Sequence, residues 1–201
     1  MQSNRDYRAD VGPPDLFDVI GALQFTIMTS HGLREHHKLL DIGCGCLRGG
    51  KLFIPYLKKG NYYGIEPNEQ LLHIGIDEEL SQGMIDFKLP TFNTSPNFDI
   101  HAFGIDFDFI LAQSIFSHAD QSQIKRCLQQ VSKHLKPYGK FIFTFFAGST
   151  NYSGTGWTRM PSAVYQYPWL AQQAQAVGLT TQKLNGFHPA GQTWVLTTHK
   201  E

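Results

Sequence analysis

Residues 39–50 read LLDIGCGCLRGG, and this stretch decides the fold class. The apolar run up to Ile42 has the character of a short buried strand, and Arg48 to Leu57 can form a helix. Glycines lie between them, and glycine is needed where a backbone takes positive φ or approaches a ligand closely. A strand, a turn and a helix in this order open a β-α-β unit. We therefore expect the turn at 43–46 to cradle a ligand.

The rest of the chain continues the alternation of strands and helices. Apolar runs predict strands at 61–66, near 92–98, at 106–113, at 140–146, at 180–184 (TTQKL) and at 193–199 (TWVLTTH). Helices are predicted at 70–80, after Asp120 and within 162–179. Cys127 falls on the apolar face of the second of these helices, so we expect it in the core. This order predicts a doubly wound α/β sheet whose final pair of strands is antiparallel.

The first part of the chain is expected to form an extension. The spacing of apolar residues predicts an amphipathic helix from Asp15, as its cap, to about Ser30. We expect a single domain over residues 1–201, with 1–35 as an N-terminal helical cap and 36–201 as the core.

Composition and charge limit the classes of partner. Lys+Arg and Asp+Glu both total 17, so the formal charge is +0 and no global field favours nucleic acid or an anionic membrane. Three cysteines are too few for a disulfide framework, which indicates a reducing, cytoplasmic setting. No stretch reaches the about 18 apolar residues of a membrane span. A small molecule is the expected partner.

The glycine turn departs from two well-known nucleotide loops. The dinucleotide pattern G-x-G-x-x-G has Arg48 at its third glycine position, and the phosphate loop has Leu52 where a hydroxyl is needed. Glu66 ends the next strand, 21 residues after Gly45, where a carboxylate can accept two hydrogen bonds from a ribose diol. Asp41 favours a cationic ligand over a pyrophosphate. The side chain of Arg48 either contacts a carboxylate of the ligand or faces solvent, and we expect it to face solvent.

Four segments in succession, LLDIGCG, YYGIEPN, FDFILAQSIFSH and LKPYGKFIFTFF, resemble the motifs of the class I S-adenosylmethionine-dependent methyltransferases. The resemblance covers residues 36–146 by motif and 160–199 by architecture. It implies a Rossmann-like seven-stranded α/β/α sandwich with a reversed last strand, S-adenosylmethionine as donor and S-adenosylhomocysteine as product. The cofactor-binding residues that it implies are Asp41, Gly43, Cys44, Gly45, Glu66, Pro67, Asn97, Phe98, Asp99, Gln113 and Ser114. Cys46 stands where many members have glycine.

A histidine follows the fourth expected strand. The segment SIFSHAD puts His118 where the transferred methyl would point, and imidazole titrates in the range that suits a general base. The alternative is a histidine that only orders its loop. We expect Asp120 to cap the following helix.

The acceptor pocket is expected to draw on several parts of the chain. Trp157 lies in a glycine-rich loop, 148–161, and is interpreted as a lid over the acceptor. The expected substrate-binding residues are Tyr7, Gln24, Trp157, Tyr165 and His188. For each of them ordinary packing is the alternative, because aromatic side chains bury large areas in any core.

The resulting hypothesis is methyl transfer to a small molecule, most simply to a hydroxyl with His118 as base. The sequence AQSIF lacks the Asn/Asp-Pro-Pro-aromatic segment of relatives that methylate amines of bases or glutamine. We expect no metal, because Asp120 is the one carboxylate after the fourth strand and the Cys44-x-Cys46 pair has no partners. The alternatives are a non-catalytic S-adenosylmethionine-binding regulatory or scaffold module, a nicotinamide-dependent oxidoreductase, and a methyltransferase domain of a larger biosynthetic enzyme.

Overall fold

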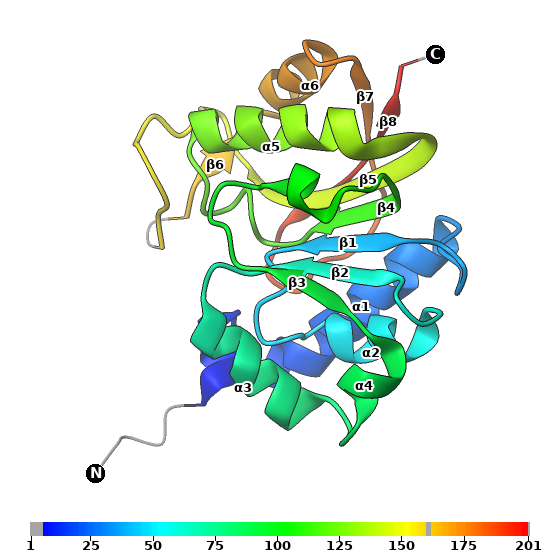
Figure 1. Cartoon of the computed structure of the whole chain (residues 1–201). Coiled ribbons are helices and arrows are strands. Elements are labelled where there is room, and N and C mark those ends of the chain that lie inside the picture. The colour runs from blue at the N-terminus through cyan, green and yellow to red at the C-terminus, as the bar shows by residue number, and fades with distance from the viewer. Residues whose placement is uncertain (1–5, 160–161, 201) are drawn as a thin grey trace. The chain divides into compact units, whose positions relative to one another are not determined.

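The structure is a computed structural model that describes residues 6–159 and 162–200. The chain divides into two compact units, Met1–Thr94 and Ser95–Glu201, which are described separately (Figure 1). The expected division into a 1–35 extension and a 36–201 core stays a prediction.

The first unit is a parallel sheet with helices. Its elements are η1 (Tyr7–Asp10), η2 (Pro14–Leu16), α1 (Phe17–Ser30), β1 (Leu39–Ile42), α2 (Gly50–Tyr56), β2 (Tyr62–Ile65), α3 (Glu69–Glu79), α4 (Met84–Lys88) and β3 (Thr91–Asn93). The strands pair in parallel in the order β3-β2-β1 (Figure 1). All four residues of β1 are buried, which explains its continuous apolar character.

Helix α1 begins later than the sequence predicts. Residues 14–16 form the 3-10 turn η2, because proline at the first position of a turn needs no amide hydrogen. The N-cap of α1 is Leu16, which makes no side-chain capping bond, so the prediction that Asp15 caps this helix is wrong. The helix packs closely through Gly21, where a Cβ would lie 2.6 Å from the carbonyl oxygen of Arg48.

Helix α3 packs closely, at Gly75, against the glycine turn that follows β1. A Cβ on Gly75 would lie 2.4 Å from the carbonyl carbon of Cys46 and 2.6 Å from its Cα. Gly75→Ala should therefore destabilise the protein by about 2 kcal/mol. The clash of the new Cβ with the Cys46 backbone outweighs the higher helix propensity of alanine, which is worth about 1 kcal/mol relative to glycine. Urea unfolding checks this, with Glu78→Ala on the exposed face of α3 as control. Equal or greater stability of Gly75→Ala contradicts the packing described.

The second unit carries the remaining strands. Its elements are η3 (Ile100–Phe103), β4 (Phe107–Ala112), α5 (Gln121–His134), β5 (Leu135–Ala147), β6 (Val164–Tyr165), α6 (Tyr167–Gln175), β7 (Leu179–Lys183) and β8 (Thr193–His199). β4 and β5 are parallel, whereas β8 runs antiparallel to both β5 and β7. The predicted reversed last strand is confirmed.

Two boundaries in this unit differ from the sequence expectation. β5 begins at Leu135, before Pro137 and Gly139, and its pairing with β4 is irregular at that end. The two-residue strand β6 lies in a region expected to be helical, and α6 starts only at Tyr167, with Pro168 in its first turn. The core of this unit is rich in phenylalanine, with Phe141 and Phe143 stacked at 5.2 Å, and Cys127 is buried as predicted.

No helix within residues 6–159 and 162–200 is both long and apolar enough to cross a bilayer.

Candidate active site

The glycine turn after β1 is tied to the end of β2. Gly43 and Gly45 have φ values of 71° and 56°, the left-handed region that favours glycine. The amide of Gly43 donates to the Ile65 carbonyl at 2.7 Å, and that of Gly45 donates to the Glu66 carboxylate (Oε2) at 3.0 Å. The turn and the carboxylate that the sequence singled out are thus brought together.

The other two glycines of the stretch serve packing. A Cβ on Gly49 would lie 2.4 Å from Oε1 of Gln24, and one on Gly50 would lie 2.9 Å from Leu47. Gln24, an expected substrate residue, is buried in α1 against Gly49. Its contact with a substrate stays a prediction.

The carboxylate of Glu66 can accept further hydrogen bonds from a ligand. Its Oε2 accepts from Gly45 and its Oε1 accepts from the amide of Asn68 at 2.8 Å. Burial raises the pKa of Glu66, and the two backbone bonds oppose this. Because each carboxylate oxygen has two lone-pair sites, both oxygens can accept a further bond from a diol. These residues fit the ribose of S-adenosylmethionine, and Pro67 beside them is exposed.

Asp41 is buried below the turn. Its Oδ2 accepts a hydrogen bond of 2.9 Å from the hydroxyl of Tyr62. Arg48, expected to face solvent, is buried instead, and its Nη1 donates to the Val11 carbonyl at 2.6 Å. The solvent expectation for Arg48 is wrong because the N-terminal segment covers this side of the turn. The Val11 side chain would also meet a Cβ on Gly45 at 2.7 Å.

The buried carboxyl of Asp41 makes stability depend on pH. Burial raises its pKa from 3.8 to about 6, against the bond from Tyr62 and the charge of Arg48. The unfolded chain therefore ionises first, and stability falls as pH rises through this window, by about 3 kcal/mol in all. Asp41→Asn removes this loss, so its stability relative to wild type should rise by about 3 kcal/mol between about pH 3 and about pH 7. Urea unfolding at several pH values checks this; a constant difference contradicts it.

The N-terminal segment is fastened to α3 through Glu79. This carboxylate, 4% exposed, accepts from the Tyr7 hydroxyl at 2.7 Å, from Arg8 Nη2 at 2.7 Å and from Lys51 Nζ at 2.9 Å. The hydroxyl of Tyr7, an expected substrate residue, thus serves this anchor. Val11 and Tyr7 also pack against the buried cluster of Phe17, Cys46 and Leu71.

The residues expected near adenine form a tight turn in the second unit. Asp99 shares a hydrogen bond with the Ser95 hydroxyl, which also accepts from the amide of Asn97. Phe98 is buried and has φ of 55°, an unusual backbone conformation for a bulky residue. Which of these residues contacts adenine stays a prediction.

A buried polar network surrounds the end of β4. Ser114 has φ of 61°, and its amide donates to Thr144 Oγ1 at 2.7 Å. Gln192 accepts from the Thr144 hydroxyl and donates to that of Ser114. Sequence reasoning missed both Thr144 and Gln192. The available signal was a polar residue inside the apolar run KFIFTFF and another directly before TWVLTTH.

His188 and Gln113 extend this network. The Nδ1 of His188 accepts from the amide of Ala190 at 3.1 Å. The side-chain nitrogen of Gln113 lies 3.2 Å from Nε2 of His188 and donates to the Ser114 hydroxyl at 2.9 Å. The contact of His188 with a substrate stays a prediction.

His118 is paired with the loop after β5. Its Nδ1 lies 2.8 Å from the carbonyl oxygen of Thr158, and its own carbonyl accepts from the Thr158 amide at 2.8 Å. A carbonyl can only accept, so Nδ1 carries the proton and Nε2 of the neutral ring has a lone pair to offer. Asp120 caps α5 as predicted, within a capping box with Gln123.

The two expected substrate aromatics of this unit differ in exposure. Trp157 is 48% exposed and its ring lies 5.8 Å from that of Phe98. Tyr165 is fully buried, donates to the Ala119 carbonyl at 2.7 Å and stacks on Trp169. Tyr165 thus supports the backbone next to His118. Met160 and Pro161, the end of the loop as the sequence delimits it, lie outside the described residues.

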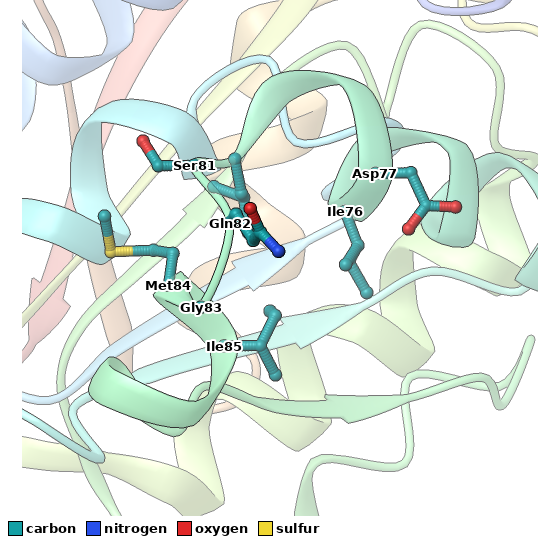
Figure 2. A pocket seen from close by; sticks show the side chains of 8 residues that line it. Ile76, Asp77, Ser81, Gln82, Gly83, Met84 and Ile85 are labelled. Atoms are coloured by element: carbon teal, nitrogen blue, oxygen red, sulfur yellow. The ribbon is translucent and has the colours of Figure 1, made fainter.

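A cavity of about 310 Å³ lies elsewhere, between α3 and α4. Figure 2 shows Ile76, Met84 and Ile85 among its lining side chains. It lies at the end of α3, an 11-residue helix whose first turn follows Glu66. Ligands of open α/β sheets bind at the carboxyl ends of strands, so this cavity is not the candidate active site. Among the described residues, no cluster of His, Cys, Asp and Glu is arranged to hold a metal ion.

A family model described as a methyltransferase domain matches residues 40–141, more than half of the chain. No curated protein matches. Three similar solved structures share the fold. Magnesium protoporphyrin IX methyltransferase from Synechocystis PCC 6803, with bound S-adenosylmethionine, is 12% identical, with a TM-score of 0.67 and 100% of each chain covered.

The second is an S-adenosylmethionine-dependent methyltransferase from Clostridium acetobutylicum ATCC 824, 13% identical, with a TM-score of 0.66, covering 100% of this chain and 94% of that one. The third, the glycopeptide N-methyltransferase MtfA complexed with S-adenosylmethionine, is 12% identical, with a TM-score of 0.68, covering 90% of this chain and 94% of that one. At these identities the similarity shows the fold. The predicted Rossmann-like fold is confirmed.

Proposed function

The chain belongs to the methyltransferase-domain family, whose donor is S-adenosylmethionine, and on that premise we propose that it methylates a hydroxyl group of a small-molecule acceptor. The predicted enzyme class and cofactor are confirmed. The acceptor, the atom methylated and the role of His118 are the proposal.

The residues of the first unit would hold the sugar and the methionine part of the cofactor. Glu66 would accept hydrogen bonds from the ribose diol through the lone pairs that its backbone bonds leave available. Gly43 and Gly45 allow the turn its positive φ, and a ligand would approach the turn at Gly43, because Val11 occupies the place of a Cβ on Gly45. Asp41 would contribute negative charge beneath the turn.

His118 carries the proposal for the acceptor. When bound, S-adenosylmethionine supplies a methyl group on a positively charged sulfur, and sulfur keeps the bonding electrons as that methyl joins the acceptor oxygen. An alcohol or phenol must also give up its proton. Nε2 of His118 would take it, because the bond from Nδ1–H to the Thr158 carbonyl fixes the tautomer in which Nε2 is the acceptor. This bond is the observation on which the proposal rests.

The acceptor is proposed to be small because balanced charge offers no field for a nucleic acid or a membrane surface. The similar structures include an N-methyltransferase, so nitrogen is the competing acceptor atom. A basic amine that is already deprotonated needs no general base.

The experiment compares matched acceptors. Pairs of compounds that differ only in carrying a hydroxyl or an amine at the same position are incubated with S-adenosylmethionine, and release of S-adenosylhomocysteine is followed. We expect turnover with the hydroxyl members. Turnover confined to the amines, with normal cofactor binding, contradicts the proposal.

A further inference from the structure

Trp157 sits on a segment that is fixed on both sides. The amide of Gly156 donates to the Asp120 carboxylate, and the amide of Thr158 donates to the His118 carbonyl at 2.8 Å. Further along, the amide of Ala163 donates to the Ser117 carbonyl at 2.8 Å. A hinged lid would have few such contacts. Trp157 therefore belongs to a pinned wall beside the residues that follow β4.

The indole of Trp157 is only partly covered. Its contact with Phe98 is tilted at 50°, and 48% of the residue remains exposed. Phe98 itself is 4% exposed and is held with φ of 55°. The wall thus presents a large aromatic surface on a backbone that is hydrogen-bonded on both sides of Trp157. A ligand that stacks on the indole therefore has little backbone entropy left to remove.

The placement of this surface connects it to the proposed chemistry. Trp157 directly precedes Thr158, whose carbonyl accepts from Nδ1 of His118. Because Thr158 is hydrogen-bonded to His118, the aromatic wall adjoins the proposed base. Flat aromatic rings stack on indole in offset or tilted geometries that saturated rings of the same size cannot match.

From this arrangement we infer that the acceptor is a planar aromatic ring that bears the hydroxyl, stacked on Trp157 with the hydroxyl directed to His118. The inference rests on the proposed function, since it names the substrate class of the same site. In this arrangement Trp157 binds the aromatic ring and His118 accepts the proton of the hydroxyl.

The test uses naphthol and its saturated counterpart decahydronaphthol, two alcohols of the same skeleton. Binding to the protein saturated with S-adenosylhomocysteine is measured by calorimetry, which requires no chemistry. We expect naphthol to bind about tenfold more tightly than decahydronaphthol, as for aromatic stacking in general. Trp157→Leu should abolish this difference, whereas Trp157→Phe should retain most of it.

Two controls separate loss of the ring from loss of structure. Tyr138→Leu, at an exposed aromatic residue of β5, should behave as wild type, and Trp157→Leu should keep the circular dichroism spectrum of the wild type. Equal binding of the two alcohols by wild type, or a preference for naphthol that survives in Trp157→Leu, overturns the inference.

Turnover with S-adenosylmethionine distinguishes this inference from the proposed function. Naphthol that binds on Trp157 without being methylated supports the aromatic site and contradicts the proposed reaction. Decahydronaphthol methylated as efficiently as naphthol, with no effect of Trp157→Leu, supports the reaction and overturns the aromatic site.

Discussion

Replacing His118 by Ala should lower kcat/KM for a hydroxyl acceptor by about 10² to 10⁴, the usual contribution of a positioned general base. The loss should be largest for acceptors that hold their proton most firmly. Initial rates of S-adenosylhomocysteine formation measure this loss.

His118→Asn is the matched variant, because the amide nitrogen of Asn can take the place of Nδ1 and keep the bond to the Thr158 carbonyl. It lacks any group in the place of Nε2. We expect His118→Asn to be as slow as His118→Ala but as stable as wild type in urea unfolding. A fully active His118→Asn would assign to this residue the ordering of its loop and remove it from the chemistry.

Replacing Glu66 by Ala should weaken S-adenosylmethionine binding about 100-fold. The carboxylate would lose its bonds to the ribose, and hydrogen bonds to a charged acceptor contribute about 1.5–3 kcal/mol each. The Gly45 amide would also lose its present acceptor, which loosens the turn. Calorimetric titration of S-adenosylmethionine and S-adenosylhomocysteine measures the change, and both ligands should be affected alike because they share the ribose.

Two further variants serve as comparisons for the loss of affinity in Glu66→Ala. Glu66→Gln keeps one acceptor oxygen but presents an amide group to one of the two backbone amides, so an intermediate loss of about tenfold is expected. Glu69→Gln, exposed in the first turn of α3, should bind as wild type. Normal affinity of a folded Glu66→Ala protein would remove this carboxylate from the cofactor site.

The parts of the site that are local in sequence could be predicted. The turn at Gly43 and Gly45 and the strand that ends before Glu66 follow from apolar runs and glycine spacing, because these features depend on a few adjacent residues. The capping role of Asp120 is similarly local, since its partner Gln123 is three residues away.

The features that sequence reasoning missed depend on distant partners. Arg48 is buried because Val11, 37 residues away, folds over it, and no property of the arginine itself signals this. Gln192 reaches Ser114 across 78 residues, so its role emerges only once β8 is paired with β5. The short strand β6 has two residues, too few for any periodic pattern.

The most direct test of the account is to locate the methyl group after a reaction with isotope-labelled S-adenosylmethionine and naphthol. We predict that the label is found on the naphthol oxygen by NMR, and that formation of this ether is strongly reduced in His118→Asn. A label on carbon, or no transfer by a protein that binds both S-adenosylmethionine and naphthol, would contradict methylation of a hydroxyl with His118 as the base.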